Sequence, residues 1–77
     1  MLLEAQERRL CEEIAAGQAP YSQRASALLA LDRGATQAAA TQESGLTIGQ
    51  VRYWLRKFRK IRMDMFPDEL LPQSELE

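Results

Sequence analysis

Six basic side chains lie close together in the second half of the chain, where they could bind an anionic partner. They fall within eleven consecutive positions that contain no acidic residue: Arg52, Arg56, Lys57, Arg59, Lys60 and Arg62. Arginine and lysine pair readily with phosphate and carboxylate groups, so phosphate binding is the first chemistry that this segment offers.

The acidic residues that balance this charge lie elsewhere in the sequence. They are Glu4, Glu7, Glu12 and Glu13 near the start, and Asp64, Asp68, Glu69, Glu75 and Glu77 near the end. The net charge of the whole chain is only −1, which argues against a uniformly basic nucleic-acid binder. The positive field is therefore local to one segment.

Residues that commonly perform catalysis or bind metal ions are scarce. The chain contains no histidine and one cysteine, Cys11, so it cannot form an internal disulfide and offers no credible set of zinc ligands. Histidine is also the commonest general base, and no serine or cysteine has an evident activating partner. We therefore predict no enzymatic activity, no catalytic or metal-binding residue and no cofactor, and no small-molecule substrate is evident.

The length of 77 residues fits one small domain or a piece of a larger protein, because so short a chain cannot bury two independent cores. The composition, 45% hydrophobic and 27% charged, is typical of soluble globular proteins. No apolar run approaches the roughly 20 residues that span a bilayer, and the first residues lack the pattern of a secretory signal. These features predict a cytoplasmic protein without a membrane partner.

Helix-forming stretches separated by capping and terminating residues predict an all-α fold. The expected helices are residues 2–16, stopped by Gly17; a segment from Pro20 to Gly34; a short alanine-rich helix between Thr36 and Gly45; and a long helix capped by Thr47 that ends near residues 63–65, before Pro67. The first helix has a thin apolar stripe, so it must pack on something to be stable.

The long last helix divides into an apolar face and a charged face. With about 100° between successive residues, four apolar side chains lie within roughly 60° of Val51, namely Trp54, Leu55, Phe58 and Met65. The opposite side carries Gly49, Tyr53, Arg56 and Lys60, flanked by Arg52 and Arg59 on one side and by Gln50 and Lys57 on the other. We expect the first group, Trp54 included, to form the core, with Leu46 as a further buried residue and Cys11 only semi-buried.

A short helix, a tight turn containing Gly45 and a longer basic helix form the arrangement of a helix-turn-helix domain, whose second helix enters the major groove of DNA. The segment "TIGQVRYWLRKFRK" resembles the third helix of homeodomain-like proteins, which has a T-x-x-Q-V-R/K-x-W-F/L pattern. The residues that match are Thr47, Gln50, Val51, Arg52, Trp54 and Leu55. Residues 20–62 are similar to bacterial helix-turn-helix domains at the front of insertion-sequence transposases and related multidomain proteins.

The sequence departs from this family pattern at several positions. A larger aliphatic residue is usual where Ala40 stands, an apolar residue at Ser44, and a smaller alanine at Thr41. The adenine-reading asparagine of homeodomains falls at Lys57. The sequence preference of homeodomains therefore cannot be carried over.

The resemblance implies a three-helix homeodomain-like core with an additional N-terminal helix. We expect an N-terminal helix (1–17), a helix-turn-helix domain (18–65) and a flexible tail or linker to a further domain (66–77). The N-terminal helix could pack on the three-helix core or form a dimer contact. Leu76 and Glu77 can also be remains of an expression-tag junction, so no function is assigned to them.

The resemblance also implies that the last helix binds double-stranded DNA. The candidate contact residues are Thr47, Gly49, Gln50, Arg52, Tyr53, Arg56, Lys57, Arg59 and Lys60. Among them Tyr53, Arg56, Lys57 and Lys60 take the base-contacting positions of homeodomains, although an ordinary solvated helix face is the alternative.

Some candidates have a second interpretation. Thr47 is a helix cap first, and Gly49 either allows close approach of the DNA backbone or is simply tolerated on the surface. Arg59 and Arg62 lie nearer the packed side, where they either cover the edge of the core or touch phosphates.

Two functions stay open from the sequence. The first is a DNA-binding module of a larger bacterial protein, such as a transcription regulator or a transposase-like protein. The alternative is a protein-interaction or polyanion-binding module that keeps the fold without reading DNA, which the small polar helix after Thr36 and the acidic ends of the chain favour. A single helix-turn-helix usually binds weakly, so we expect a homodimer or a fused C-terminal domain.

Overall fold

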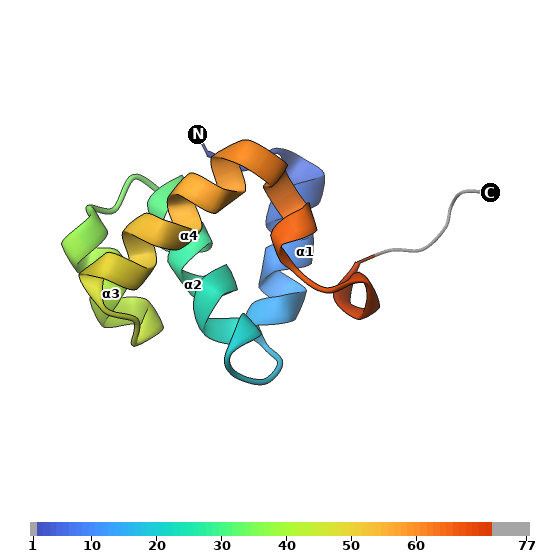
Figure 1. Ribbon diagram of the computed structural model, residues 1–77, viewed down its shortest axis with the longest axis horizontal. Helices are drawn as coiled ribbons and strands as arrows, with labels where there is room; N and C mark the ends of the chain where they lie inside the picture. The colour runs from blue at the N-terminus through green and yellow to red at the C-terminus, as the bar shows by residue number, and fades with distance from the viewer. Residues whose placement is uncertain (1, 72–77) are drawn as a thin grey trace.

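The chain is described here from a computed structural model, which covers residues 2–71 and shows an all-helical fold without strands in that range (Figure 1). The helices are α1 (Ala5–Ala15), α2 (Tyr21–Asp32), α3 (Gln37–Ser44) and α4 (Ile48–Ile61), followed by the short 3-10 turns η1 (Arg62–Met65) and η2 (Asp68–Leu70). The expected all-α fold is confirmed. None of the helices in residues 2–71 is long and apolar enough to cross a membrane.

Local sequence signals set the boundaries of α3 and α4. The hydroxyl of Thr36 accepts a hydrogen bond from the Ala39 N–H at 3.0 Å, and that of Thr47 accepts one from the Gln50 N–H at 3.1 Å. The side chain of Gln50 in turn accepts from the Thr47 N–H at 3.0 Å, which completes a capping box. Gly45 ends α3 with φ of 80°, a left-handed conformation that glycine adopts without strain. These three expected caps are confirmed.

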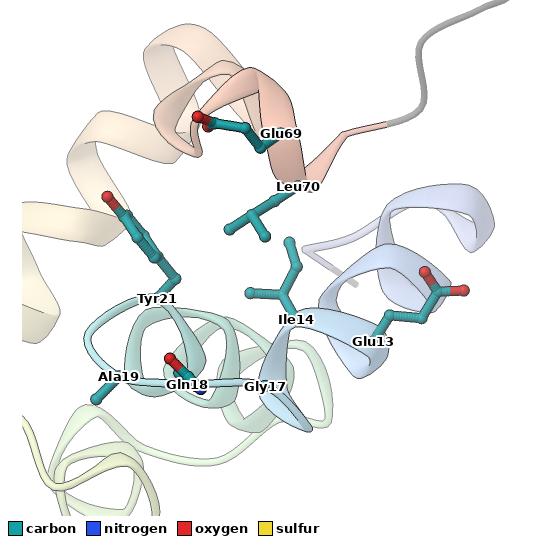
Figure 2. Close-up of a pocket in the computed structure, with 8 residues that line it drawn as sticks. All are labelled: Glu13, Ile14, Gly17, Gln18, Ala19, Tyr21, Glu69 and Leu70. Atoms are coloured by element: carbon teal, nitrogen blue, oxygen red, sulfur yellow. The ribbon is translucent and has the colours of Figure 1, made fainter.

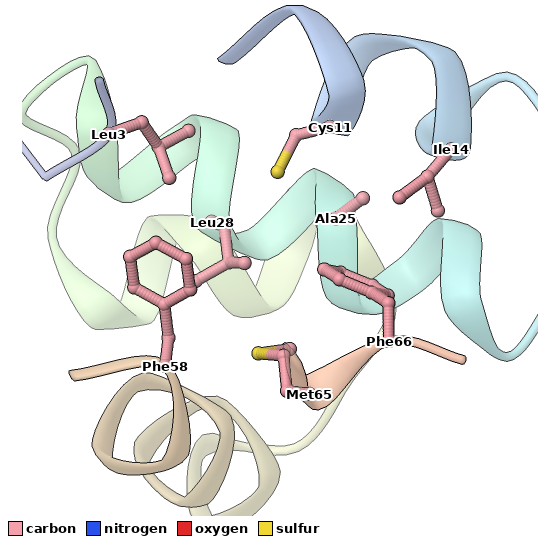
Figure 3. Packing of buried hydrophobic residues seen from close by; sticks show 8 residues of the cluster. All are labelled: Leu3, Cys11, Ile14, Ala25, Leu28, Phe58, Met65 and Phe66. Atoms are coloured by element: carbon pink, nitrogen blue, oxygen red, sulfur yellow. The ribbon is translucent and has the colours of Figure 1, made fainter. Parts of the chain in front are cut away.

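Helix α2 lies between α1 and α3, and α4 packs against α2 and α3 (Figure 1). The buried side chains form two clusters. The larger one consists of Leu3, Cys11, Ile14, Ala25, Leu28, Phe58, Met65 and Phe66, and Figure 3 shows Phe58 pointing from α4 toward Leu28. The smaller one consists of Ala27, Ala30, Ala40 and Val51. Both α2 and α4 contribute to each cluster, so they join the two halves of the fold.

The small second cluster accounts for the unusual residues of α3. Ala40 is fully buried among the alanines of α2, where a larger aliphatic side chain would overpack the contact. Ser44 is buried too, but its hydroxyl donates to the Ala40 carbonyl at 2.7 Å and accepts from the Leu46 N–H at 3.2 Å. Because both hydrogen-bonding capacities are used, this polar side chain is tolerated where an apolar one is usual. Leu46, expected to be buried, is half-buried against this cluster.

The carboxylate of Asp32 ties α1 to the end of α2. Asp32 is only 8% exposed, and it accepts hydrogen bonds from the Leu3 N–H and from Arg8 Nε, each at 2.8 Å. Arg8 also donates to the Leu3 carbonyl at 3.0 Å. The hydrogen bond from Arg8, against the opposing effect of burial, holds the pKa of Asp32 below its ordinary value of 3.8. The N-terminal helix therefore packs on α2 within the same chain.

The end of α4 differs from the expected position near residues 63–65. The α-helix stops at Ile61 because Arg62 adopts φ of 54° and ψ of −134°, a conformation that costs energy in a residue other than glycine. The Arg62 guanidinium is held there by α1, since it donates to the two carboxylate oxygens of Glu7 at 2.6 and 3.1 Å. It also lies over the Phe58 ring, 4.4 Å from the centroid. The α-helix thus ends six residues before Pro67, at the point where Arg62 forms a long-range ion pair with Glu7.

Residues 66–71, which the sequence assigned to a flexible tail, are part of the fold. Phe66 is 2% exposed in the larger cluster, and Leu70 and Leu71 pack against that cluster. Phe66 packs against side chains of α1 and α2 (Figure 3). These contacts join distant parts of the chain, so no local sequence pattern could predict them. Residues 72–77, including Leu76 and Glu77, lie outside the described range, and the division of the chain into domains stays a prediction.

Three further expected degrees of burial differ in the structure, the first being Leu55, which was expected in the core and is half-buried. Cys11 is fully buried rather than semi-buried, and burial, helped by nearby carboxylates, raises the pKa of its thiol to about 12. Trp54 is half-buried rather than a central core residue. The reason is its place at the edge of the larger cluster, where the side chain of Arg24 covers its ring.

The two carboxylates that hold α1 predict a loss of stability in acid. Burial alone would raise the pKa of Glu7, but the hydrogen bonds from Arg62 and from the Glu4 N–H, with the Arg62 charge, lower it below 4.5. Both Glu7 and Asp32 thus have depressed pKa values in the folded state. Their stabilisation is present above the unfolded values of about 4 and is lost as the pH falls through the lower folded values.

We expect the midpoint temperature of thermal unfolding to decrease as the pH is lowered below about 4. In Asp32→Asn, which is less stable at neutral pH, this temperature should decrease less steeply with pH. Glu13→Gln is the control, because Glu13 is exposed on α1 and forms no ion pair within residues 2–71. Circular dichroism between about pH 7 and about pH 2 measures both. An acid loss in Asp32→Asn as steep as in the wild type would contradict this role.

Candidate nucleic-acid interface

The charged face predicted from the sequence lies on α4 and its cap. All nine candidate residues are exposed: Thr47, Gly49, Gln50, Arg52, Tyr53, Arg56, Lys57, Arg59 and Lys60. The core side of the same helix holds Val51 and Phe58, which are 1% and 0% exposed. Helix periodicity alone therefore accounts for the division into two faces.

Most of the positive charge on this face has no partner in the described part of the chain. Helix α4 carries five basic residues and no acidic one. Within residues 2–71, the side chains of Arg56, Arg59 and Lys60 form no hydrogen bond or ion pair. Arg59 and Lys60 lie in the last turn, where the helix dipole favours cations. These groups can bind an anion without first breaking a contact within the domain.

Three of the arginines outside α4 form ion pairs, whereas Arg9 and Arg24 form none within residues 2–71. Arg8 pairs with Asp32, Arg33 with Glu43, and Arg62 with Glu7. Arg62, which the sequence left between covering the core and touching phosphates, is thus engaged with α1 and with Phe58. The arginines that form ion pairs within the fold are therefore different residues from the α4 cations that can bind an external anion.

Two candidates on α4 are oriented by neighbouring side chains. Arg52 Nε donates to Gln37 Oε1 at 3.2 Å, which links α4 to the first residue of α3. Tyr53 is 46% exposed; its ring meets Trp54 edge-on at a centroid distance of 4.8 Å and lies 5.9 Å from Lys57 Nζ. Gln37 was not predicted as part of this surface, because its contact with Arg52 joins residues on different helices.

The first turn of α4 contains backbone N–H groups that the helix itself does not pair. The Thr47 hydroxyl and the Gln50 side-chain oxygen are both used in the capping box. The first N–H groups of the helix, at Ile48 and Gly49, lie where an α-helix provides no intrahelical partner, and such groups favour an anion.

Gly49 itself is not required by the packing of the fold. A Cβ atom at this position would approach only the Thr47 hydroxyl, at 3.9 Å, which is an ordinary contact. A glycine in a helix costs stability relative to alanine, so this residue is open to a functional explanation.

A separate pocket of about 510 Å³ lies between the end of α1, the α1–α2 loop and η2. Figure 2 shows Ile14 and Leu70 pointing toward one another there, beside Tyr21, with Glu13 and Glu69 also in the lining. Two carboxylates do not suit a phosphate ligand. Among residues 2–71, no three cysteine, aspartate or glutamate side chains are placed to hold a metal ion. The pocket lies apart from the basic face.

Comparison with protein families gives a match over the helices that carry this face. A family model described as a helix-turn-helix domain matches residues 23–62. The chain belongs to the helix-turn-helix domain family. The expected resemblance to a homeodomain-like helix-turn-helix domain is confirmed, and the family is not typically enzymatic. No curated protein and no solved structure matches the chain.

Within this helix-turn-helix domain, α3 is the first helix of the motif, residues 45–47 form the turn, and α4 is the second helix. Helix α1 and residues 63–71 lie outside the matched range. In helix-turn-helix domains generally, the second helix of the motif is the one that enters the major groove of DNA.

The two faces of α4 predict opposite responses to truncation. Phe58→Ala should lower the free energy of unfolding by about 3–5 kcal/mol, because it empties a fully buried site, whereas Arg56→Ala should change it by less than about 0.5 kcal/mol. Urea denaturation followed by circular dichroism measures both values. Similar losses in the two variants would show that the faces are wrongly assigned.

Proposed function

We propose that this helix-turn-helix domain binds double-stranded DNA and that α4 is the helix that enters the major groove. The observation that carries the proposal is the exposed face of α4, with five basic residues, no acidic residue and three cations without a partner in residues 2–71. Family membership over residues 23–62 supports it independently.

The dimensions of α4 suit this role. Its 14 residues make a rod about 21 Å long and, with side chains, about 10–12 Å across, and the major groove is about 12 Å wide. On the face opposite the core, Arg56 and Lys60 reach toward base edges, where arginine or lysine pairs with guanine. Arg52 and Arg59 lie on one flank of the helix and Lys57 on the other, toward the phosphates.

Salt dependence tests the proposal. If about four to six phosphates are neutralised, the logarithm of the association constant should fall with the logarithm of salt concentration with a slope of about −4 to −5. Fluorescence anisotropy with labelled duplex DNA measures the slope, and Arg56→Ala should weaken binding while the domain stays folded.

A competition experiment separates DNA binding from the binding of any polyanion. Polyphosphate, added at the same concentration of negative charge as unlabelled duplex, should displace the labelled DNA much less well. Equal displacement would favour the polyanion-binding alternative, and a flat salt response would overturn the proposal.

Gly49 gives a test in which stability and binding change in opposite directions. Gly49→Ala should stabilise the domain by about 0.4–1 kcal/mol, because alanine restricts the unfolded chain and fits the helix. The same methyl group should weaken DNA binding if the backbone of α4 approaches a phosphate closely at this point. Unfolding and anisotropy titrations on one preparation measure both quantities, and unchanged or tighter binding would mean that glycine is merely tolerated here.

We further propose that the domain belongs to a larger bacterial protein of the cytoplasm, either a transcription regulator or a transposase-like protein. A short recognition surface such as α4 usually needs a second copy or another domain to reach specific affinity. A homodimer or a fused C-terminal domain would supply it.

A further inference from the structure

Arg24, in the first turn of α2, places its guanidinium group over two aromatic rings, one of which belongs to α4. The carbon of its guanidinium group lies 4.0 Å from the centroid of the Trp54 ring and 5.2 Å from that of Tyr21. The residue is half-buried, and its side chain forms no hydrogen bond or ion pair within residues 2–71. A guanidinium stacked on aromatic rings keeps its N–H donors free at its edge.

The position of Arg24 matters because the two flanks of α4 carry unequal charge. One flank has Arg52 and Arg59, whereas the other has Lys57 as its single cation. Trp54 lies between the buried side of α4 and the Lys57 flank, by the periodicity of the helix. The guanidinium stacked on Trp54 therefore adds a second cation, from a different helix, to the flank that has fewer.

A helix in the major groove faces a phosphate backbone on each side. We propose that Arg24 binds a backbone phosphate along the Lys57 flank of α4, with Trp54 and Tyr21 holding its guanidinium ready for a bidentate contact. Such a contact is strong because it is charge-assisted and because the side chain is already ordered. This inference rests on the proposed function, and it extends the DNA-binding surface from α4 to the start of α2.

A purely structural role for Arg24 makes a different prediction, and the variant Arg24→Met separates the two. Methionine keeps an unbranched chain that can cover Trp54, but it has no charge and no N–H donors. If Arg24 only shields the ring, DNA binding by this variant should equal that of the wild type. If Arg24 binds a phosphate, the salt slope should be smaller in magnitude by about 1.

The experiment is an anisotropy titration with duplex DNA at several salt concentrations. The controls are Arg56→Ala on the groove face and Arg9→Met on the exposed side of α1, outside the matched residues. Arg24→Met should bind more weakly than the wild type, and this deficit should shrink roughly three- to fourfold between about 50 and about 200 mM salt. Arg9→Met should match the wild type.

The outcomes distinguish the two levels of the argument. If the wild type does not bind duplex DNA, the proposed function itself fails. If the wild type binds and Arg56→Ala weakens binding, but Arg24→Met keeps the wild-type slope, only the role of Arg24 is overturned.

A second measurement needs no substitution, so it decides the question even if Arg24→Met does not fold. The NMR signal of the Arg24 Nε–H group in the wild type should shift on addition of duplex DNA. An unmoved Arg24 signal beside a shifted Arg56 signal would also overturn the role.

Discussion

The whole structure depends on how α4 is fixed against α2. Val51 and Phe58 are seven residues apart, so they lie on the same side of α4, and each is almost completely buried in a different cluster. Two buried points on one stripe fix both the direction of the helix and its rotation about its own axis. The outward direction of Arg56 and Lys60 is therefore a consequence of core packing. No ion pair within residues 2–71 is needed to aim these side chains.

Charge is divided between fold and surface in a way that the sequence does not show. Counted by type, the arginines are equivalent, but Arg8 and Arg62 each meet a carboxylate whose pKa is lowered in the folded state. Those pairs hold α1 and the end of α4 in place. Most of the cations without an ion pair in the described residues lie on α4, where binding an anion would relieve their mutual repulsion. Glu7, in the acidic first segment, thus serves as the partner of a structural arginine, which weakens the argument that this segment marks a protein-binding module.

The features that the sequence predicted well are local ones. Thr36, Gly45 and Thr47 act within a few residues of their own position, and the apolar period of α4 is contained in a single helix. The features that it missed depend on residues far apart, such as Arg62 with Glu7, 55 positions away, and Arg8 with Asp32, 24 positions away. The same holds for the candidate site: the exposed residues of α4 followed from periodicity, whereas Gln37 and Arg24 became visible only when separate helices were brought together. Phe66 was placed in a tail because prolines and acidic residues follow it, whereas its partners on α1 and α2 lie far from it in the sequence.

Helix α1 and the residues after α4 supply large buried apolar side chains, of which the matched helix-turn-helix region has few. The cluster between α2, α3 and the start of α4 is built mainly from alanines, which bury little apolar area and therefore contribute little stabilisation. The larger side chains lie on the other side, where Leu3, Ile14 and Phe66 surround residues of α2 and α4. Because Phe58 lies in that cluster, the segments outside the matched range stabilise the orientation of the basic face. The contact between α3 and α4 can therefore bury little apolar area while α4 stays firmly held, because the larger cluster holds the other end of α4 through Phe58.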